Sequence, residues 1–271
     1  MALSAANPIG EEARTMIKEA TIEKLTKMRL GAMAEAFEHQ CNDKAFQSLS
    51  FEDRFSMIVD KQWEKRQNKK IKNLITTAAF RYPGACMEDI EYLADRKLDR
   101  SQMLELSTCG YISDGYHIIL KGAAGCGKTY ISNALGIAAC RNFMKVRYIR
   151  LPELFVELEV ARAEGTLKKT LKAYKNCDLL ILDDFLLTPL TSEETRLLLE
   201  IIEVKTIHGS VIFCSQFEIE GWIHRMGTDD DATVAEAIID RFKHASYIIS
   251  IKGNKSMRER HGLSAGKRGA K

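Results

Sequence analysis

A glycine-rich segment, Gly122–Thr129 (GAAGCGKT), constrains the fold of this chain more than any other part of the sequence. It follows an apolar run, His117–Leu120, and fits the pattern G-x-x-x-x-G-K-[ST]. In this pattern glycines let backbone N–H groups surround phosphates at the start of a helix. The sequence therefore predicts a strand, a phosphate-binding loop and a helix, with Lys128 on the β- and γ-phosphates and Thr129 on Mg²⁺. The candidate nucleotide-binding residues are Gly122, Ala123, Ala124, Gly125, Cys126, Gly127, Lys128, Thr129 and Tyr130.

The segments around this loop predict an α/β domain. Five short apolar runs are candidate strands: His117–Leu120, Val146–Ile149, Leu179–Asp183, Val211–Ser215 and Tyr247–Ile251. Between the first four lie amphipathic segments of helical length: Tyr130–Arg141, Pro152–Ala163 and Glu193–Ile207. This alternation is typical of right-handed strand–helix–strand units. We expect residues 107–271 to form a five-stranded parallel sheet with helices on both faces.

The first part of the chain follows a helical pattern instead. Apolar residues recur at helical spacing, as in Phe51, Phe55, Ile58 and Val59. Ser50, followed by two acidic residues of a first turn, resembles a helix N-cap. We expect residues 1–106 to form a helical domain that binds DNA or a partner protein.

Composition excludes several classes of protein. The 271 residues are 45% hydrophobic and 28% charged, which is typical of a globular chain. With 40 Lys and Arg against 37 Asp and Glu, the net charge of +3 excludes a uniformly basic nucleic-acid binder, so any such site must be a local patch. The seven cysteines form no C-x-x-C pair and predict reduced thiols of a cytosolic protein. We expect neither secretion nor membrane insertion, because no signal-peptide pattern or long apolar run is present.

A second motif, Leu179–Asp184 (LLILDD), ends an apolar run with two carboxylates. The carboxyl end of a parallel strand is where such sheets bind ligands. We expect Asp183 to join the Mg²⁺ shell and Asp184 to polarise or orient the attacking water. The alternative is a buried strand that simply ends in a solvated turn.

Two further segments carry candidate catalytic residues. The strand Val211–Ser215 leads to Gln216, whose side chain, or that of Ser215, is a candidate to bond the γ-phosphate or the water. A polar strand terminus is an equal alternative. Arg241 lies among apolar neighbours in IIDRF and is a candidate to stabilise transition-state charge at the phosphates of a neighbouring subunit. A surface pair with Asp240 or Asp231 is the alternative.

Local basic patches indicate where nucleic acid would bind. Residues 61–72 contain six positive charges against one acid, Glu64. On a helix, four of the lysines follow i, i+4, i+8, i+11 spacing and line one face, which suits a phosphate backbone as well as it suits solvent. A second cluster follows Glu164-Gly165. The candidate DNA contacts are Lys61, Lys65, Lys69 and Lys72 in the first patch, and Lys168 and Lys169, with Lys172, in the second. We expect backbone contacts with little sequence choice.

Taken in order, these motifs resemble AAA+ ATPases of the DnaC/IstB type, and most closely the IstB-like ATP-binding proteins of insertion sequences. The resemblance covers nearly the whole chain, since the segments Leu30–Phe37, Leu49–Arg54 and Trp63–Arg66 also match that family's N-terminal pattern. It implies that Lys128, Thr129, Asp183 and Asp184 bind nucleotide and Mg²⁺, that Gln216 or Ser215 acts as sensor 1, and that Arg241 is the arginine finger in trans. It also places Lys168 and Lys169 where ring-forming relatives direct loops toward nucleic acid.

Two features depart from the family. Only 30 residues follow Arg241, so we expect the C-terminal lid domain of many AAA+ proteins to be reduced or absent. Arg258 is a candidate for a sensor-2-like charge, with a solvated helix as an equal alternative. Within the loop, Ala123, Ala124 and Cys126 replace residues common in relatives, but these positions offer mainly their backbone.

The resemblance implies an ATP-dependent DNA-binding accessory protein of transposition, an ATPase that uses ATP and Mg²⁺. Its expected partners are duplex DNA, a transposase and further copies of itself in a ring or spiral. A DnaC-like loader of a replicative helicase is the alternative within the superfamily. Two other classes remain: a P-loop kinase for a small molecule, and a nucleotide-gated binding module with almost no turnover, because Asp184 is one methylene shorter than Glu.

Overall fold

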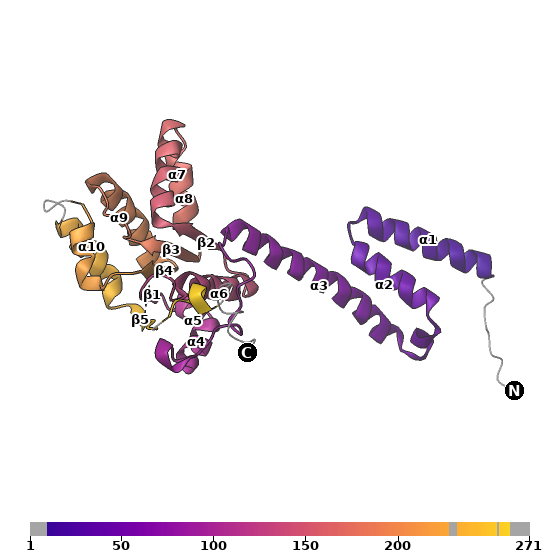
Figure 1. Ribbon diagram of the computed structural model, residues 1–271. Coiled ribbons are helices and arrows are strands. Elements are labelled where there is room, and N and C mark those ends of the chain that lie inside the picture. Colours follow the sequence, from indigo (N-terminus) through magenta and orange to yellow (C-terminus); the bar gives the residue numbers. More distant parts are fainter. Residues whose placement is uncertain (1–9, 228–231, 254, 261–271) are drawn as a thin grey trace. The chain divides into compact units, whose positions relative to one another are not determined.

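The computed structural model describes residues 10–227, 232–253 and 255–260. The chain divides into two compact units, Met1–Lys72 and Asn73–Lys271, called here the helical unit and the sheet unit (Figure 1). The division falls earlier than the boundary expected after residue 106. The reason is packing: Ala78, Phe80 and Met103 are buried in one cluster with the strand residue Ile118, although they lie in the part of the sequence with a helical pattern.

The helical unit contains α1 (Glu11–Lys27), α2 (Gly31–Asn42), the 3-10 helix η1 (Lys44–Ser48) and α3 (Phe51–Ala78), of which residues 73–78 belong to the sheet unit. Ser50 caps α3 as predicted, because its Oγ accepts a hydrogen bond from the backbone N–H of Asp53 at 3.1 Å. Ser50 Oγ also donates to the Asp53 carboxylate at 2.8 Å. The two acidic residues of the first turn, Glu52 and Asp53, favour the positive end of the helix dipole.

Two buried amide side chains join α2 to α3. The Oε1 atom of Gln62 accepts hydrogen bonds from the backbone N–H groups of Ala32 (3.1 Å) and Met33 (3.4 Å) at the start of α2. Near the other end of α2, Gln40 Nε2 donates to the backbone carbonyl of Arg54 at 2.9 Å. Gln62 therefore supplies an acceptor for N–H groups that the start of a helix leaves without intrahelical partners. Gln40 adds a second hydrogen bond between the two helices.

The sheet unit is built on five parallel strands in the order β2-β3-β4-β1-β5. The strands are β1 (His117–Lys121), β2 (Val146–Arg150), β3 (Leu179–Phe185), β4 (Ser210–Ser215) and β5 (Ser246–Ser250). The α-helices that follow residue 78 are α4 (Arg100–Ser107), α5 (Gly110–Ser113), α6 (Lys128–Arg141), α7 (Leu151–Ala163), α8 (Leu167–Lys175), α9 (Ser192–Ile207), α10 (Ala232–Lys243) and α11 (Met257–Arg260). Short 3-10 helices are η2 (Ala94–Arg96), η3 (Ile219–Gly221) and η4 (Ile223–Arg225). The five predicted strands and the three predicted helices of this region are confirmed.

Helices cover both faces of the sheet. Along β3, Leu179 and Ile181 pack in one buried cluster and Leu180 and Leu182 in the other, as the two-residue period of a strand requires. The first cluster includes residues of α4, α5 and α6, and the second includes residues of α7, α8, α9 and α10. The result is a three-layer α/β/α unit (Figure 1).

Helix α8 lies where the sequence analysis predicted no helix. Its residues Leu171 and Tyr174 are buried in the second cluster, and Leu167 packs against it. This i, i+4, i+7 spacing is the apolar stripe of an amphipathic helix. The basic cluster at 168–172 consequently lies on a helix and not in a loop. After β5, the only helix in the described residues is α11.

No helix in the described ranges has the length and apolar character needed to cross a membrane.

Candidate nucleotide-binding site

The loop between β1 and α6 has the strand–loop–helix context that its sequence predicted, and α6 begins at Lys128. Gly122 has φ +155°, and a Cβ added there would lie 2.4 Å from the backbone carbonyl oxygen of Ile251. Gly127 has φ +99°, in the left-handed region that glycine adopts without strain. Both glycines are therefore required by the path of the loop and by the chain packed against it.

Lys128 is buried and its ammonium group lies inside its own loop. Its Nζ donates hydrogen bonds to the carbonyl oxygens of Gly122 (2.6 Å) and Ala123 (2.9 Å). Its side chain therefore already reaches across the loop that would hold phosphates. Two residues further along α6, the hydroxyl oxygen of Tyr130 accepts a hydrogen bond from the backbone N–H of Cys86 at 3.2 Å.

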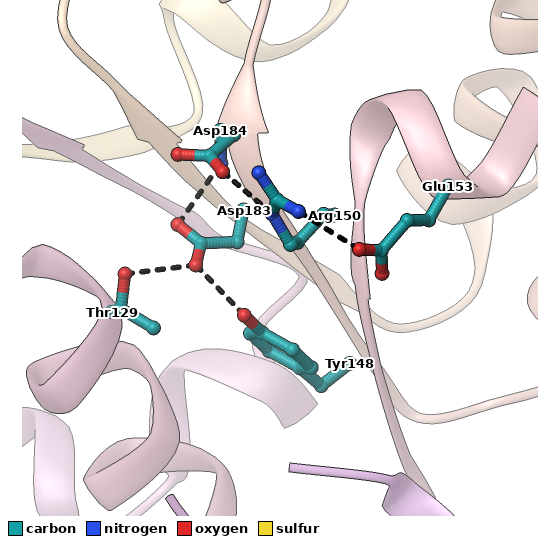
Figure 2. Close-up of polar contacts among 6 residues, drawn as sticks. All are labelled: Thr129, Tyr148, Arg150, Glu153, Asp183 and Asp184. Atoms are coloured by element: carbon teal, nitrogen blue, oxygen red, sulfur yellow. Dashed lines mark hydrogen bonds and ion pairs between the residues drawn. The ribbon is translucent and has the colours of Figure 1, made fainter. Parts of the chain in front are cut away.

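The carboxylate of Asp183 is the centre of a hydrogen-bonded cluster (Figure 2). Its Oδ2 atom accepts hydrogen bonds from the hydroxyl groups of Thr129 and Tyr148, each at 2.8 Å. Asp183 is 1% exposed. Burial, followed by the neighbouring Asp183, raises the pKa of Tyr148, so this phenol keeps its proton and remains a donor. The predicted pair Thr129 and Asp183 is thus brought together from the loop and the end of β3.

A break in the strand register places the two carboxylates. Leu182 pairs with Phe213, but Phe185 pairs with Ser215, so the ladder is irregular between Leu182 and Phe185. Asp184 has φ +49°, a left-handed conformation that aspartate tolerates better than most residues. Such irregularities turn side chains away from the regular alternation of a strand. They direct Asp183 and Asp184 differently, although the sequence presents them as one pair.

Asp184 is held by an arginine from the neighbouring strand β2 (Figure 2). Arg150 Nε donates to Asp184 Oδ2 at 2.7 Å, and its Nη1 donates to Glu153 Oε1 at 2.9 Å. The hydrogen bond to Asp184 and then that to Glu153 raise the pKa of Arg150. The backbone N–H of Asp184 also donates to Asp183 Oδ1 at 2.9 Å. Tyr148 and Arg150 belong to no motif that predicted them as site residues; the indication that the sequence offered is their position in, or directly after, the apolar run Val146–Ile149.

The two polar residues at the end of β4 have different environments. Ser215 is fully buried; its Oγ donates to the Phe185 carbonyl at 3.1 Å and accepts from the Phe217 N–H at 3.2 Å. Gln216 is exposed. Because the Ser215 hydroxyl already has two partners, Gln216 is the better candidate to contact a ligand.

Arg241 lies on α10 with a partly exposed side chain. It pairs with Glu203 of α9, with Nη2 at 3.0 Å from Oε1, and its Nη1 donates to the Ala237 carbonyl at 2.7 Å. The observed partner is therefore Glu203, and not Asp240; Asp231 lies outside the described residues. The structure does not bring Arg241 together with the loop through these contacts, as expected for a residue that acts on another subunit or for a surface pair.

The basic residues of both predicted patches are exposed. The first patch is on the continuous helix α3, where Lys65 lies 3.5 Å from Glu35. The second is on α8, opposite the buried residues Leu171 and Tyr174. The exposed lysines are Lys61, Lys65, Lys69 and Lys72 on α3, and Lys168, Lys169 and Lys172 on α8. The side chain of Arg258, in α11, lies outside the described part of the chain.

The fold and this site define a P-loop nucleotide-binding protein. Solved structures with a similar fold include the crystal structure of DnaI, with a TM-score of 0.55 at 20% identity, covering 67% of this chain and 94% of that one. The AMPPCP-bound DnaA of Aquifex aeolicus has a TM-score of 0.54 at 19% identity, covering 66% of this chain and 53% of that one. At these identities the similarity establishes the fold alone.

The sequence comparisons are more specific. The sequence model of the IstB-like ATP binding protein family matches residues 23–265. An insertion-sequence ATP-binding protein of Sinorhizobium fredii is 32% identical over 238 residues, covering 88% of this chain and 96% of that protein. The ATP-binding protein of insertion sequence IS1162 from Pseudomonas fluorescens is 34% identical over 201 residues, covering 74% and 87%. The chain belongs to the family of IstB-like ATP-binding proteins, as its motifs predicted.

Proposed function

We propose that this chain is an ATP-dependent, DNA-binding helper protein of transposition, which assembles on target DNA and regulates a partner transposase. The observation that carries the proposal is the cluster at the end of β3, where Thr129, Asp183 and Asp184 gather beside the phosphate-binding loop. The relatives named above are insertion-sequence proteins, which supports the link to transposition.

The site suits a nucleotide with Mg²⁺. Thr129 Oγ1 and Asp183 Oδ2 are hard oxygen donors 2.8 Å apart, the donor type that Mg²⁺ prefers. In the described residues no cluster of three or more His, Cys, Asp or Glu side chains is suited to a metal, which fits an ion held largely by phosphates and water. When bound, Mg²⁺ supplies charge neutralisation at the β- and γ-phosphate oxygens. Lys128 would release the loop carbonyls and bind these oxygens.

Hydrolysis would require Asp184 to accept a hydrogen bond from water. Arg150 donates to the Oδ2 atom of Asp184, so the water would bond the Oδ1 atom or the remaining lone pair of Oδ2. Gln216, exposed at the adjacent end of β4, would contact the γ-phosphate or the water. Arg241 would exchange Glu203 for the phosphates of a neighbouring subunit, because an arginine placed there stabilises transition-state charge.

DNA would bind through the exposed lysines of α3 and α8. Side chains of this kind neutralise backbone phosphates without distinguishing bases. A ring or spiral of subunits would strengthen such contacts by avidity.

The test is ATP turnover with and without duplex DNA, in wild type and in Arg241→Ala. We expect DNA to stimulate turnover and to enlarge the ATP-bound assembly. Arg241→Ala should lower the stimulated rate about 100-fold while the ATP Kd stays within about twofold. The matched control is Lys243→Ala, an exposed residue of the same helix, which should behave as wild type.

The opposite result also has a clear meaning. An ATP turnover rate that changes neither with DNA nor with Arg241→Ala overturns the interface mechanism and favours a P-loop kinase with a small-molecule acceptor. ATP-dependent DNA binding that is unaffected by Asp184→Asn favours a binding module with almost no turnover. Binding to a replicative helicase in place of a transposase supports the DnaC-like alternative.

A further inference from the structure

A buried arginine from outside the strand–loop–helix unit contacts the phosphate-binding loop. Arg96, the last residue of η2, is 3% exposed. Its Nη2 donates to the backbone carbonyl of Cys126 at 3.0 Å, and its Nη1 donates to the carbonyl of Glu91 at 2.5 Å. Burial lowers the pKa of Arg96, and the neighbouring Cys126, Glu91 and Asp95 only partly oppose this. A charged group is costly to bury, so its position against the loop requires a reason.

The geometry of the Cys126–Gly127 peptide explains why Arg96 lies there. The peptide that joins Cys126 to Gly127 is trans, and in a trans peptide the C=O and N–H groups point in opposite directions. Because the Cys126 carbonyl points to Arg96, the N–H of Gly127 points away from Arg96. A charged donor on the carbonyl polarises the peptide and makes that N–H a stronger donor.

Glycine at position 127 is what permits this contact. A Cβ built on Gly127 would lie 2.9 Å from Arg96 Nη2. The guanidinium of Arg96 therefore occupies the space that the Cβ of any other residue at position 127 would need. A side chain at position 127 would therefore displace this guanidinium, in addition to straining the left-handed backbone.

The segment after β5 is attached to the same arginine-bearing turn. The backbone N–H of Lys252 donates to the Arg96 carbonyl at 3.1 Å, and the N–H of Met257 donates to the Gly125 carbonyl at 2.8 Å. Arg260 forms an ion pair with Asp95. The turn that carries Arg96 and the segment after β5 are thus joined to each other and to the phosphate-binding loop, although they lie far apart in the sequence.

We propose that Arg96 is a positioning residue for the diphosphate part of the nucleotide: it fixes and polarises the Cys126–Gly127 peptide so that the Gly127 N–H donates to a phosphate oxygen. The Asp95–Arg260 pair secures this arrangement by tying the segment after β5, which also contacts the loop through Met257, to the turn that carries Arg96. The inference rests on the proposed nucleotide site. The ligands it concerns are nucleoside di- and triphosphates.

The test compares the Kd values of ATP, ADP and AMP, measured by calorimetry on the full chain. Arg96→Lys keeps the charge but loses the two-pronged donor geometry. We expect it to raise the Kd of ATP and ADP about tenfold, and that of AMP less than twofold. Its KM for ATP should rise by the same factor with kcat within about threefold, since binding is lost equally in ground and transition states. Arg100→Lys, an exposed arginine of α4, is the matched control and should bind all three like wild type.

The remaining variants separate the possible failures. Lys128→Ala tests the nucleotide site itself: if ATP binding survives in it, the proposed site is wrong, whatever Arg96 does. If Arg96→Lys melts at a much lower temperature than wild type, Arg260→Gln takes its place, with an expected threefold rise in the ATP and ADP Kd at wild-type stability. Unchanged ATP and ADP binding in a folded Arg96→Lys, an equal loss for AMP, or unchanged binding in Arg260→Gln overturns the proposal.

Discussion

The two units of this chain differ in how extensively they bury their apolar side chains. In the sheet unit, apolar residues fill two clusters on either side of the sheet, and Asp183, Asp184, Lys128 and Arg96 all have hydrogen-bond partners. In the helical unit, α3 leaves large apolar side chains exposed, among them Phe51 (73%), Phe55 (51%) and Trp63 (63%). A packed core fixes functional groups in place, whereas a lightly packed helix leaves its side chains available for other molecules. The comparison predicts that mutations in the two units differ in kind.

The largest difference is expected between two phenylalanines. Phe213 is fully buried, with its ring centroid 4.8 Å from that of Phe185 and 4.5 Å from that of Phe242. Phe213→Ala should lower the free energy of unfolding by about 3–5 kcal/mol, because it leaves a cavity in the core. Phe55→Ala should lower it by less than about 0.5 kcal/mol. Urea unfolding of both variants checks this, and similar losses in the two would contradict the contrast.

The next effect depends on pH and belongs to the sheet unit. Burial, with a contribution from Lys205, lowers the pKa of His117 to about 4 from an ordinary value of 6.5. Its Nδ1 accepts the backbone N–H of Val211 at 3.1 Å. Folded His117 stays neutral where the unfolded chain takes up a proton, so its contribution to stability is complete above pH 6.5. It is lost as pH falls toward 4, by up to about 3 kcal/mol.

His117→Asn isolates this effect, because asparagine keeps an acceptor but does not titrate. Between pH 6.5 and 4, we expect the free energy of unfolding to fall more in the wild type than in His117→Asn. Urea titrations at several pH values measure this. Parallel curves for the two proteins would show that His117 does not cause the pH dependence.

A smaller effect is expected at the joint between α2 and α3 in the helical unit. Gln62→Ala leaves the N–H groups of Ala32 and Met33 without their acceptor, at a cost of about 1–2 kcal/mol. Gln62→Glu keeps an acceptor at a helix N-terminus and should retain most of the stability. Amide hydrogen exchange at residues 32 and 33 is the measurement. Equal protection in all three proteins would mean that the side chain of Gln62 does not stabilise the contact between α2 and α3.

The smallest effect on stability is expected at the exposed lysines. The pair Lys65–Glu35 is more than half exposed on both sides, so Lys65→Ala should change the free energy of unfolding by less than about 0.5 kcal/mol. If α3 binds DNA as proposed, the same change lowers the slope of log K against log salt by about one. Lys27→Ala, on α1 and paired with Glu23, is the control. An unchanged slope in Lys65→Ala would remove Lys65 from the proposed contact surface.

The sequence determined the strand–loop–helix unit, the five strands and the family, because these depend on local spacing and on residue types that have few substitutes. Apolar runs of strand length predicted β1 to β5, and the loop pattern located the start of α6. The helix α8 was missed because its stripe of three apolar residues stands among lysines, and burial against the sheet was needed to define it.

Tertiary structure alone decided which side chains support the site. Tyr148 meets Asp183, Arg150 meets Asp184 and Arg96 meets Cys126 across 30 or more residues of sequence. It also decided that residues 73–106 belong with the sheet, since Phe80 and Met103 are buried there. The physical reason is the same in each case: a motif specifies the groups that perform chemistry through local backbone geometry, whereas their partners are specified only by the packing of distant segments.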